Sequence, residues 1–188
     1  LKILEEPPEN SYLILTVENI SSLLPTIISR CVMFKTPTPS VDDAKSFLKA
    51  EGYENLSSQL PLFSNLPLDV IAHQSNIDLF TMIINEFKKG GDFELMAIDP
   101  RWLNEDFKET ISLFQKWLYD IFLFKMTKKY HFFVSKNENI KKLSDAADIT
   151  KLLKLLKSVN NIKLISNKPI NKDISFDNLM VEYKNVFK

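Results

Sequence analysis

From Ser40 to the last residue, apolar side chains recur at the three- and four-residue spacing that lines one face of an α-helix. Glycine, which weakens helix interiors, occurs only three times in the 188 residues, and two of the three form the pair Gly90-Gly91. Because 45% of the residues are hydrophobic, a chain of this length can bury a real core. The pattern therefore predicts a globular, predominantly α chain with a break at the glycine pair.

A small helical module is expected from Ser40 onward, where the helical spacing of apolar residues begins. Ser40 with Asp43 resembles a capping box, and Pro67 is the kind of residue that favours the first position of a helix. The helices expected in this module are 41–51, 54–63 and 67–73.

A helical bundle is expected from about residue 75 onward. Asn104 is placed to cap the longest of its helices, 105–130, which is apolar around much of its circumference. We therefore expect this helix to lie buried at the centre of the bundle. The other helices expected here are 77–89, 149–166 and 171–187.

The first 38 residues have a different pattern of apolar residues. Residues 11–17 form a continuous apolar run rich in β-formers, which suits a central parallel strand covered on both faces. Asn19 or Ser21 is expected to cap a short helix that ends at Arg30, and an edge-like strand is expected at 31–34. This order predicts an α/β part that two prolines separate from the helices. Since the chain starts with what reads as a helix end, we expect it to begin inside a domain.

Charge is distributed unevenly along a chain whose net charge is zero. Residues 1–104 carry 8 basic and 14 acidic side chains, whereas residues 105–188 carry 16 and 10. The second half can attract nucleic acid or an acidic partner, or its lysines simply solvate helix faces. Within it, lysines interleave with aromatics over 125–133, as in single-strand binders, although packed aromatics with lysines reaching outward give the same pattern.

Several classes of function have no support in the sequence. The one cysteine, Cys31, excludes an internal disulfide and a Cys-rich zinc site, and it suits a reducing compartment. His73 and His131 have no Asp or Ser partner at motif spacing, so we assign no catalysis to them. Without a secretory signal or an apolar run of about 18 residues, we expect a cytoplasmic protein with no membrane partner and no metal.

Arg30 is the strongest candidate for a functional side chain. Only two of the 24 basic residues are arginine, Arg30 and Arg101, which suggests a need for a planar and permanently charged donor fork. The simpler alternative is a cation at a helix C-terminus, worth about 0.3–1 kcal/mol. The adjacent carboxylates Glu5 and Glu6 are expected to be structural, because neighbouring side chains on a helix point apart.

Three segments taken together resemble a known family, the bacterial clamp-loader subunits of the AAA+ ATPases. They are Leu-Glu-Glu-Pro-Pro at 4–8, the strand-like run ending in Leu-Thr-Val at 15–17, and Leu-Pro-Thr-Ile-Ile-Ser-Arg-Cys at 24–31. The resemblance is close over the first 31 residues, and beyond them it lies more in segment order than in sequence.

Within that family the chain is more similar to the non-hydrolysing delta-prime subunits of DNA polymerase III than to the gamma/tau ATPases. Hydrolysing relatives have a Thr-Thr sensor where this chain has Val17-Glu18, and a sensor arginine where it has Pro67. The C-terminal segment 169–179 also looks like the last helix of delta-prime. The gamma/tau ATPase remains the first alternative.

The resemblance implies that Ser29, Arg30 and Cys31 are the family's Ser-Arg-Cys motif, with Arg30 an arginine finger inserted in trans into a neighbour's ATP site. ATP and Mg²⁺ would be held by that neighbour, and no cofactor by this chain. The complex is an ATPase within the DNA polymerase III holoenzyme, whereas this subunit would have no catalytic activity of its own.

The same resemblance implies three domains and a set of partners. The domains would be the C-terminal part of an AAA+ core at 1–38, a helical lid at 39–74, and a helical collar at 75–188. The collar would join gamma/tau and delta subunits into a hetero-oligomer that loads the sliding clamp on primer-template DNA for replication. A second alternative is a helical interaction scaffold with no nucleotide role.

Overall fold

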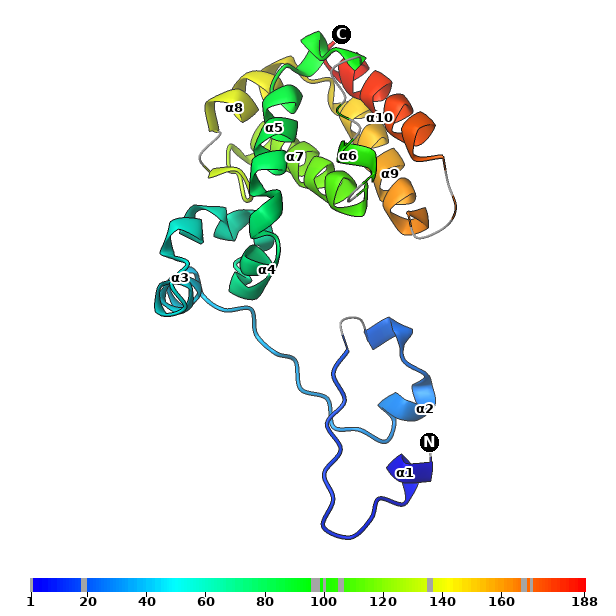
Figure 1. Cartoon of the computed structure of the whole chain (residues 1–188). Coiled ribbons are helices and arrows are strands. Elements are labelled where there is room, and N and C mark those ends of the chain that lie inside the picture. Colours follow the sequence, from blue (N-terminus) through cyan, green and yellow to red (C-terminus); the bar gives the residue numbers. More distant parts are fainter. Residues whose placement is uncertain are drawn as a thin grey trace. The chain divides into compact units, whose positions relative to one another are not determined.

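The fold is known from a computed structural model, which describes residues 2–17, 20–95, 99, 101–104, 107–134, 137–166, 169 and 171–188. The chain divides into two compact units, residues 1–38 and residues 39–188 (Figure 1). Helices make up nearly all of the regular structure in the described residues. The mostly helical character predicted from the sequence is therefore confirmed, whereas the finer division of 39–188 into lid and collar stays a prediction.

The regular structure in the described residues of the first unit consists of short helical pieces. These are α1 (Lys2–Glu5), the 3-10 turn η1 (Ile20–Ser22) and α2 (Pro25–Ile28). The two strands predicted at 11–17 and 31–34 are wrong for the structure, because no described residue of either segment has strand pairing. A strand needs a neighbour for its hydrogen bonds, and the described residues offer none. The apolar side chains of these segments are exposed instead, including Ile14 at 88% and Phe34 at 90%.

The second unit begins with the small helical module. Its elements are α3 (Val41–Ala50), the 3-10 helix η2 (Glu54–Phe63) and α4 (Pro67–Ala72). The predicted cap of the first helix is confirmed, since the Ser40 hydroxyl oxygen accepts the backbone N–H of Asp43 at 3.1 Å. The segment 54–63 was predicted only as a helix, and the structure shows that it is of the tighter 3-10 kind.

The remaining elements form the larger part of the second unit. They are η3 (Gln74–Asn76), α5 (Ile77–Phe87), η4 (Gly90–Asp92), α6 (Arg101–Asn104), α7 (Phe107–Thr127), α8 (Asn137–Ala146), α9 (Ile149–Ile165) and α10 (Lys172–Val186). The predicted cap by the Asn104 side chain, and residue 105, lie outside the described part. Helix α8 was missed from the sequence. None of the described helices is long and apolar enough to cross a bilayer.

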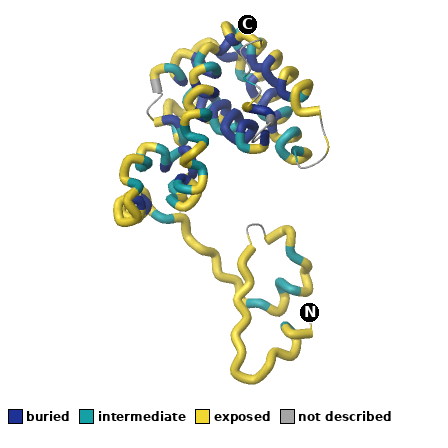
Figure 2. Tube along the Cα trace, viewed as in Figure 1, coloured by how far each residue is buried: buried dark blue, intermediate teal, exposed yellow. Residues whose placement is uncertain are grey.

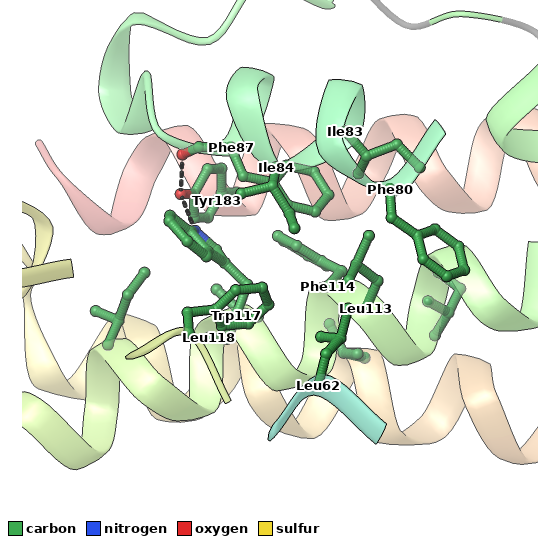
Figure 3. Packing of buried hydrophobic residues seen from close by; sticks show 14 of the residues in the cluster. Leu62, Phe80, Ile83, Ile84, Phe87, Leu113, Phe114, Trp117, Leu118 and Tyr183 are labelled. Carbon is green, nitrogen blue, oxygen red and sulfur yellow. Dashed lines mark hydrogen bonds between the residues drawn. The ribbon is translucent and has the colours of Figure 1, made fainter. Parts of the chain in front are cut away.

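Helix α7 is the centre of the core, as its sequence predicted. It packs against α8, α9, α5 and α6, and α9 packs in turn against α10. Buried side chains lie around most of its circumference, among them Phe114, Trp117 and Leu118 (Figures 2 and 3). Packing against other helices of the same chain therefore explains why α7 is apolar around most of its circumference.

A buried chain of hydrogen bonds ties three of these helices together. The indole N–H of Trp117 on α7 donates to the hydroxyl of Tyr183 on α10 at 2.9 Å, and that hydroxyl donates to the carbonyl of Phe87 at the end of α5 (Figure 3). Burial raises the pKa of the Tyr183 hydroxyl, so it stays a proton donor. Because each polar group in this chain of hydrogen bonds has a partner, the bonds fix how the three helices pack.

Gly90 permits the tight turn after α5 that the glycine pair predicted. Its φ is +56°, and an added Cβ would lie 2.5 Å from a methyl carbon of Leu143 and 3.4 Å from the ring of Phe187. Glycine is therefore needed here for both backbone conformation and space.

Candidate functional site

Arg30 lies just beyond the C-terminal end of α2. Pro25 occupies the first position of this helix, Leu24 is its N-cap without a side-chain hydrogen bond, and Ser29 is its C-cap. The sequence predicted one longer helix capped at Asn19 or Ser21. Asn19 lies outside the described residues, and Ser21 lies in the separate 3-10 turn η1, so the predicted cap at Ser21 is wrong.

Two contacts hold the Arg30 guanidinium. Its Nη2 lies 2.7 Å from a carboxylate oxygen of Glu5, and its Nη1 donates to the backbone carbonyl of Thr26 at 2.8 Å. Both partners belong to the first unit. The Thr26 bond runs back along α2, while the Glu5 pair ties the end of α2 to the end of α1. The guanidinium is therefore oriented by its own chain before any ligand arrives.

The site remains open to solvent. The Arg30 side chain is 35% exposed and that of Glu5 is 47% exposed. A pair this exposed contributes about 0–1 kcal/mol, so its replacement by another anion carries little cost. Within the described part of the chain these contacts use two of the five guanidinium N–H donors, which leaves a planar donor edge suited to a carboxylate or phosphate.

The two neighbours of Arg30 complete the predicted motif. The Ser29 hydroxyl donates to the same Thr26 carbonyl at 3.2 Å, so this carbonyl accepts from both side chains. Cys31 is a half-buried free thiol. The three motif residues thus follow one another along a single turn, and Arg30 is the charged member.

Glu5 is the residue that sequence reasoning missed. It was predicted to be structural because adjacent helical carboxylates diverge, and the structure pairs one of the two with Arg30. The available signal was that Arg30 is the sole arginine of the first 38 residues, where a carboxylate from another element is a natural partner.

The other arginine has a different environment. Arg101 forms a forked pair with Asp99, two residues before it, and Nε lies 2.9 and 3.0 Å from the two carboxylate oxygens. These hydrogen bonds hold the pKa of Asp99 at about 2. Arg101 is therefore committed to a local carboxylate, and it provides a matched control for Arg30.

The remaining candidates are described by their own surroundings. Pro67 is at the first position of α4, and Val17 is exposed while Glu18 lies outside the described residues. The ring Nδ1–H of His73 donates to the backbone carbonyl of Asp69 at 2.8 Å, and the backbone N–H of His131 donates to Asp120. Among the described residues, no group of His, Cys, Asp and Glu could hold a metal ion.

Comparison with known proteins relates the chain to one family. Residues 1–40 match the family described as DNA polymerase III, delta subunit. The chain is 37% identical over 73 residues to the DNA polymerase III subunit delta' of Haemophilus influenzae (strain ATCC 51907 / DSM 11121 / KW20 / Rd). That match covers 38% of this chain and spans 22% of the relative's length. The resemblance to delta-prime clamp-loader subunits is thus confirmed over part of the chain.

Proposed function

We propose that this chain acts as a non-hydrolysing, delta-prime-type stator subunit of a DNA polymerase III clamp loader. In this role Arg30 is an arginine finger that enters the ATP site of a neighbouring gamma/tau subunit. The observation that carries the proposal is the Ser29-Arg30-Cys31 turn, which lies in the segment matching the family and presents a guanidinium held by one carbonyl and one exposed carboxylate.

The chemistry asked of Arg30 is electrostatic. Phosphoryl transfer spreads negative charge over the oxygens of the transferred group, and a guanidinium from another chain can meet that charge in the transition state. In systems where such a finger is known it is worth about 10³–10⁵ in rate. The exposed ion pair with Glu5 keeps the Arg30 guanidinium oriented. Breaking this pair costs little free energy when a phosphate replaces the carboxylate.

The absence of hydrolysis by this chain is part of the proposal. The first position of α4 is Pro67, an uncharged residue that cannot donate to a phosphate, where hydrolysing relatives would place an arginine. ATP and Mg²⁺ are therefore assigned to the neighbouring subunit, and this chain supplies only the finger.

Assembly is assigned to the second unit, which would contain the lid and the collar. Helices α9 and α10 expose apolar side chains although both pack into the core, and such residues are candidates for contacts with gamma/tau and delta. They are Leu153, Leu164, Ile165, Ile174 and Val181. Through that cytoplasmic complex the chain would act on the sliding clamp and primer-template DNA.

The test is ATP turnover of a clamp loader reconstituted with the protein carrying Arg30→Ala, beside Arg101→Ala as the control. Gel filtration establishes that each complex assembles. We expect Arg30→Ala to remove turnover at the one ATP site that faces it and so lower total turnover by that site's share, while Arg101→Ala leaves turnover unchanged. Equal turnover in both complexes would favour a scaffold without a nucleotide role.

A further inference from the structure

The turn after α7 is fixed by a buried carboxylate. Helix α7 ends at Thr127, and Lys128 takes a left-handed backbone conformation with φ of +59°. Asp120 then accepts the backbone N–H groups of the three residues 131–133, at 2.9, 2.8 and 2.8 Å. Because Asp120 is fully buried, it anchors the returning chain and fixes the position of Tyr130, the residue just before these three.

Tyr130 and Phe124 together form one wall of a surface pocket. Their rings are nearly parallel, at an interplanar angle of 8° with centroids 6.3 Å apart. The pocket has a volume of about 230 Å³, and Glu138 and Lys141 of α8 complete its lining. This is below the roughly 300–1,000 Å³ of sites that enclose a drug-sized ligand, so it suits a single planar ring system.

The surroundings of the pocket are positively charged. The Lys128 amine lies 5.5 Å from the centroid of the Phe124 ring. Lys129 follows it in the turn, and Lys141 and Lys142 lie on α8, all three exposed. Among the described residues that line the pocket, Glu138 is the acidic one. An aromatic wall beside several lysines is the combination that binds the bases and the backbone of a single strand.

We infer that this pocket binds single-stranded nucleic acid, with one base against the rings of Tyr130 and Phe124 and its phosphates along Lys128, Lys129 and Lys141. The Glu138 carboxylate accepts a hydrogen bond from the amino group of that base, which favours cytosine over thymine. An acidic peptide is the less suitable occupant, because Glu138 repels its carboxylates and a flat aromatic wall adds nothing for them. The inference does not rest on the role of Arg30.

The test measures binding of fluorescein-labelled dC and dT 12-mers to the whole 188-residue protein without partners, by anisotropy at one low salt concentration. We expect dC to bind about 5-fold or more tighter than dT, and Glu138→Ala to abolish that difference. Tyr130→Ala should weaken dC binding about 5- to 100-fold, the range for loss of one stacked base.

Matched variants separate stacking from charge and from folding. Tyr130→Phe keeps the ring and should retain affinity, and Lys157→Ala, on an exposed position of α9, should weaken binding less than Lys141→Ala does. Thermal melting by circular dichroism shows that each variant is folded. Absence of binding, equal losses for Lys157→Ala and Tyr130→Ala, or equal affinity for dC and dT would overturn the inference. Displacement of the oligonucleotide by an equal charge concentration of poly-glutamate would overturn it in favour of an acidic protein partner.

Discussion

The two units of this chain differ in where stability and chemistry lie. Every described hydrophobic residue that is buried belongs to residues 39–188, beginning with Ala44, whereas no described residue of 1–38 is buried (Figure 2). Yet the motif that relates the chain to a family, and the arginine proposed to act in catalysis, both lie in 1–38. The region with the clearest functional signal therefore has no core of its own among the described residues.

Local physics explains the contrast. The helices α1 and α2 of the first unit have four residues each, well below the length at which an isolated helix is stable in water. A side-chain contact between distant positions of the first unit is the exposed ion pair of Arg30 with Glu5. Both tryptophans, by contrast, are buried in the second unit, so tryptophan fluorescence reports unfolding of that unit alone.

The largest expected effect on stability is that of Asp120→Ala. It removes the acceptor of three backbone N–H groups in a buried or partly buried turn, and we expect the free energy of unfolding to fall by about 2–5 kcal/mol. Urea unfolding followed by tryptophan fluorescence measures the loss. Asp120→Asn retains an acceptor oxygen and should lose less, and equal losses would show that the N–H bonds do not stabilise the turn.

Gly90→Ala should cost about 1–3 kcal/mol. The new methyl group would meet Leu143, and the left-handed backbone disfavours any side chain. Gly91→Ala is the control, because its added carbon would lie 3.4 Å from Phe187, an ordinary contact. If both variants had the same thermal midpoint, the turn would not depend on glycine at residue 90.

Tyr183→Phe tests the hydrogen bonds that join α5, α7 and α10. The change keeps the ring but leaves the Trp117 N–H and the Phe87 carbonyl without a partner in the interior. We expect a loss of about 1–3 kcal/mol in the free energy of unfolding. A neutral result would mean that water or a shifted helix satisfies these groups.

The smallest effect is expected in the first unit. Glu5→Gln removes the charge that pairs with Arg30, and the tryptophan transition should change by less than about 0.5 kcal/mol, since the pair is exposed and lies outside the core. A loss comparable to that of Tyr183→Phe would break the contrast between the units, because it would show that the pair supports the core.

The sequence predicted the second unit well because its helices carry their own signals. The apolar periodicity of α5, α9 and α10 and the cap at Ser40 each act within a few residues, so they can be read locally. Helix α8 was missed although Ile140 and Leu143 have helical spacing.

The first unit was predicted less well for the same physical reason. A strand needs hydrogen-bonding partners that are distant in sequence. A run rich in β-forming residues, such as 11–17, therefore shows a preference for extended backbone but does not by itself form a strand. The Ser29-Arg30-Cys31 motif was recognised from its residues, but the partner of Arg30 was not. Glu5 lies 25 positions earlier, and only the fold brings the two side chains together.

The proposed role of Arg30 is tested most directly by ATP turnover per assembled complex, compared between the protein with Arg30 and the Arg30→Ala variant. We expect turnover to fall while the gel-filtration profile and the tryptophan unfolding transition stay unchanged, since Arg30 lies outside the core. Unchanged turnover in an intact complex would contradict it, and Arg30 would then be only a cation at the end of a short helix.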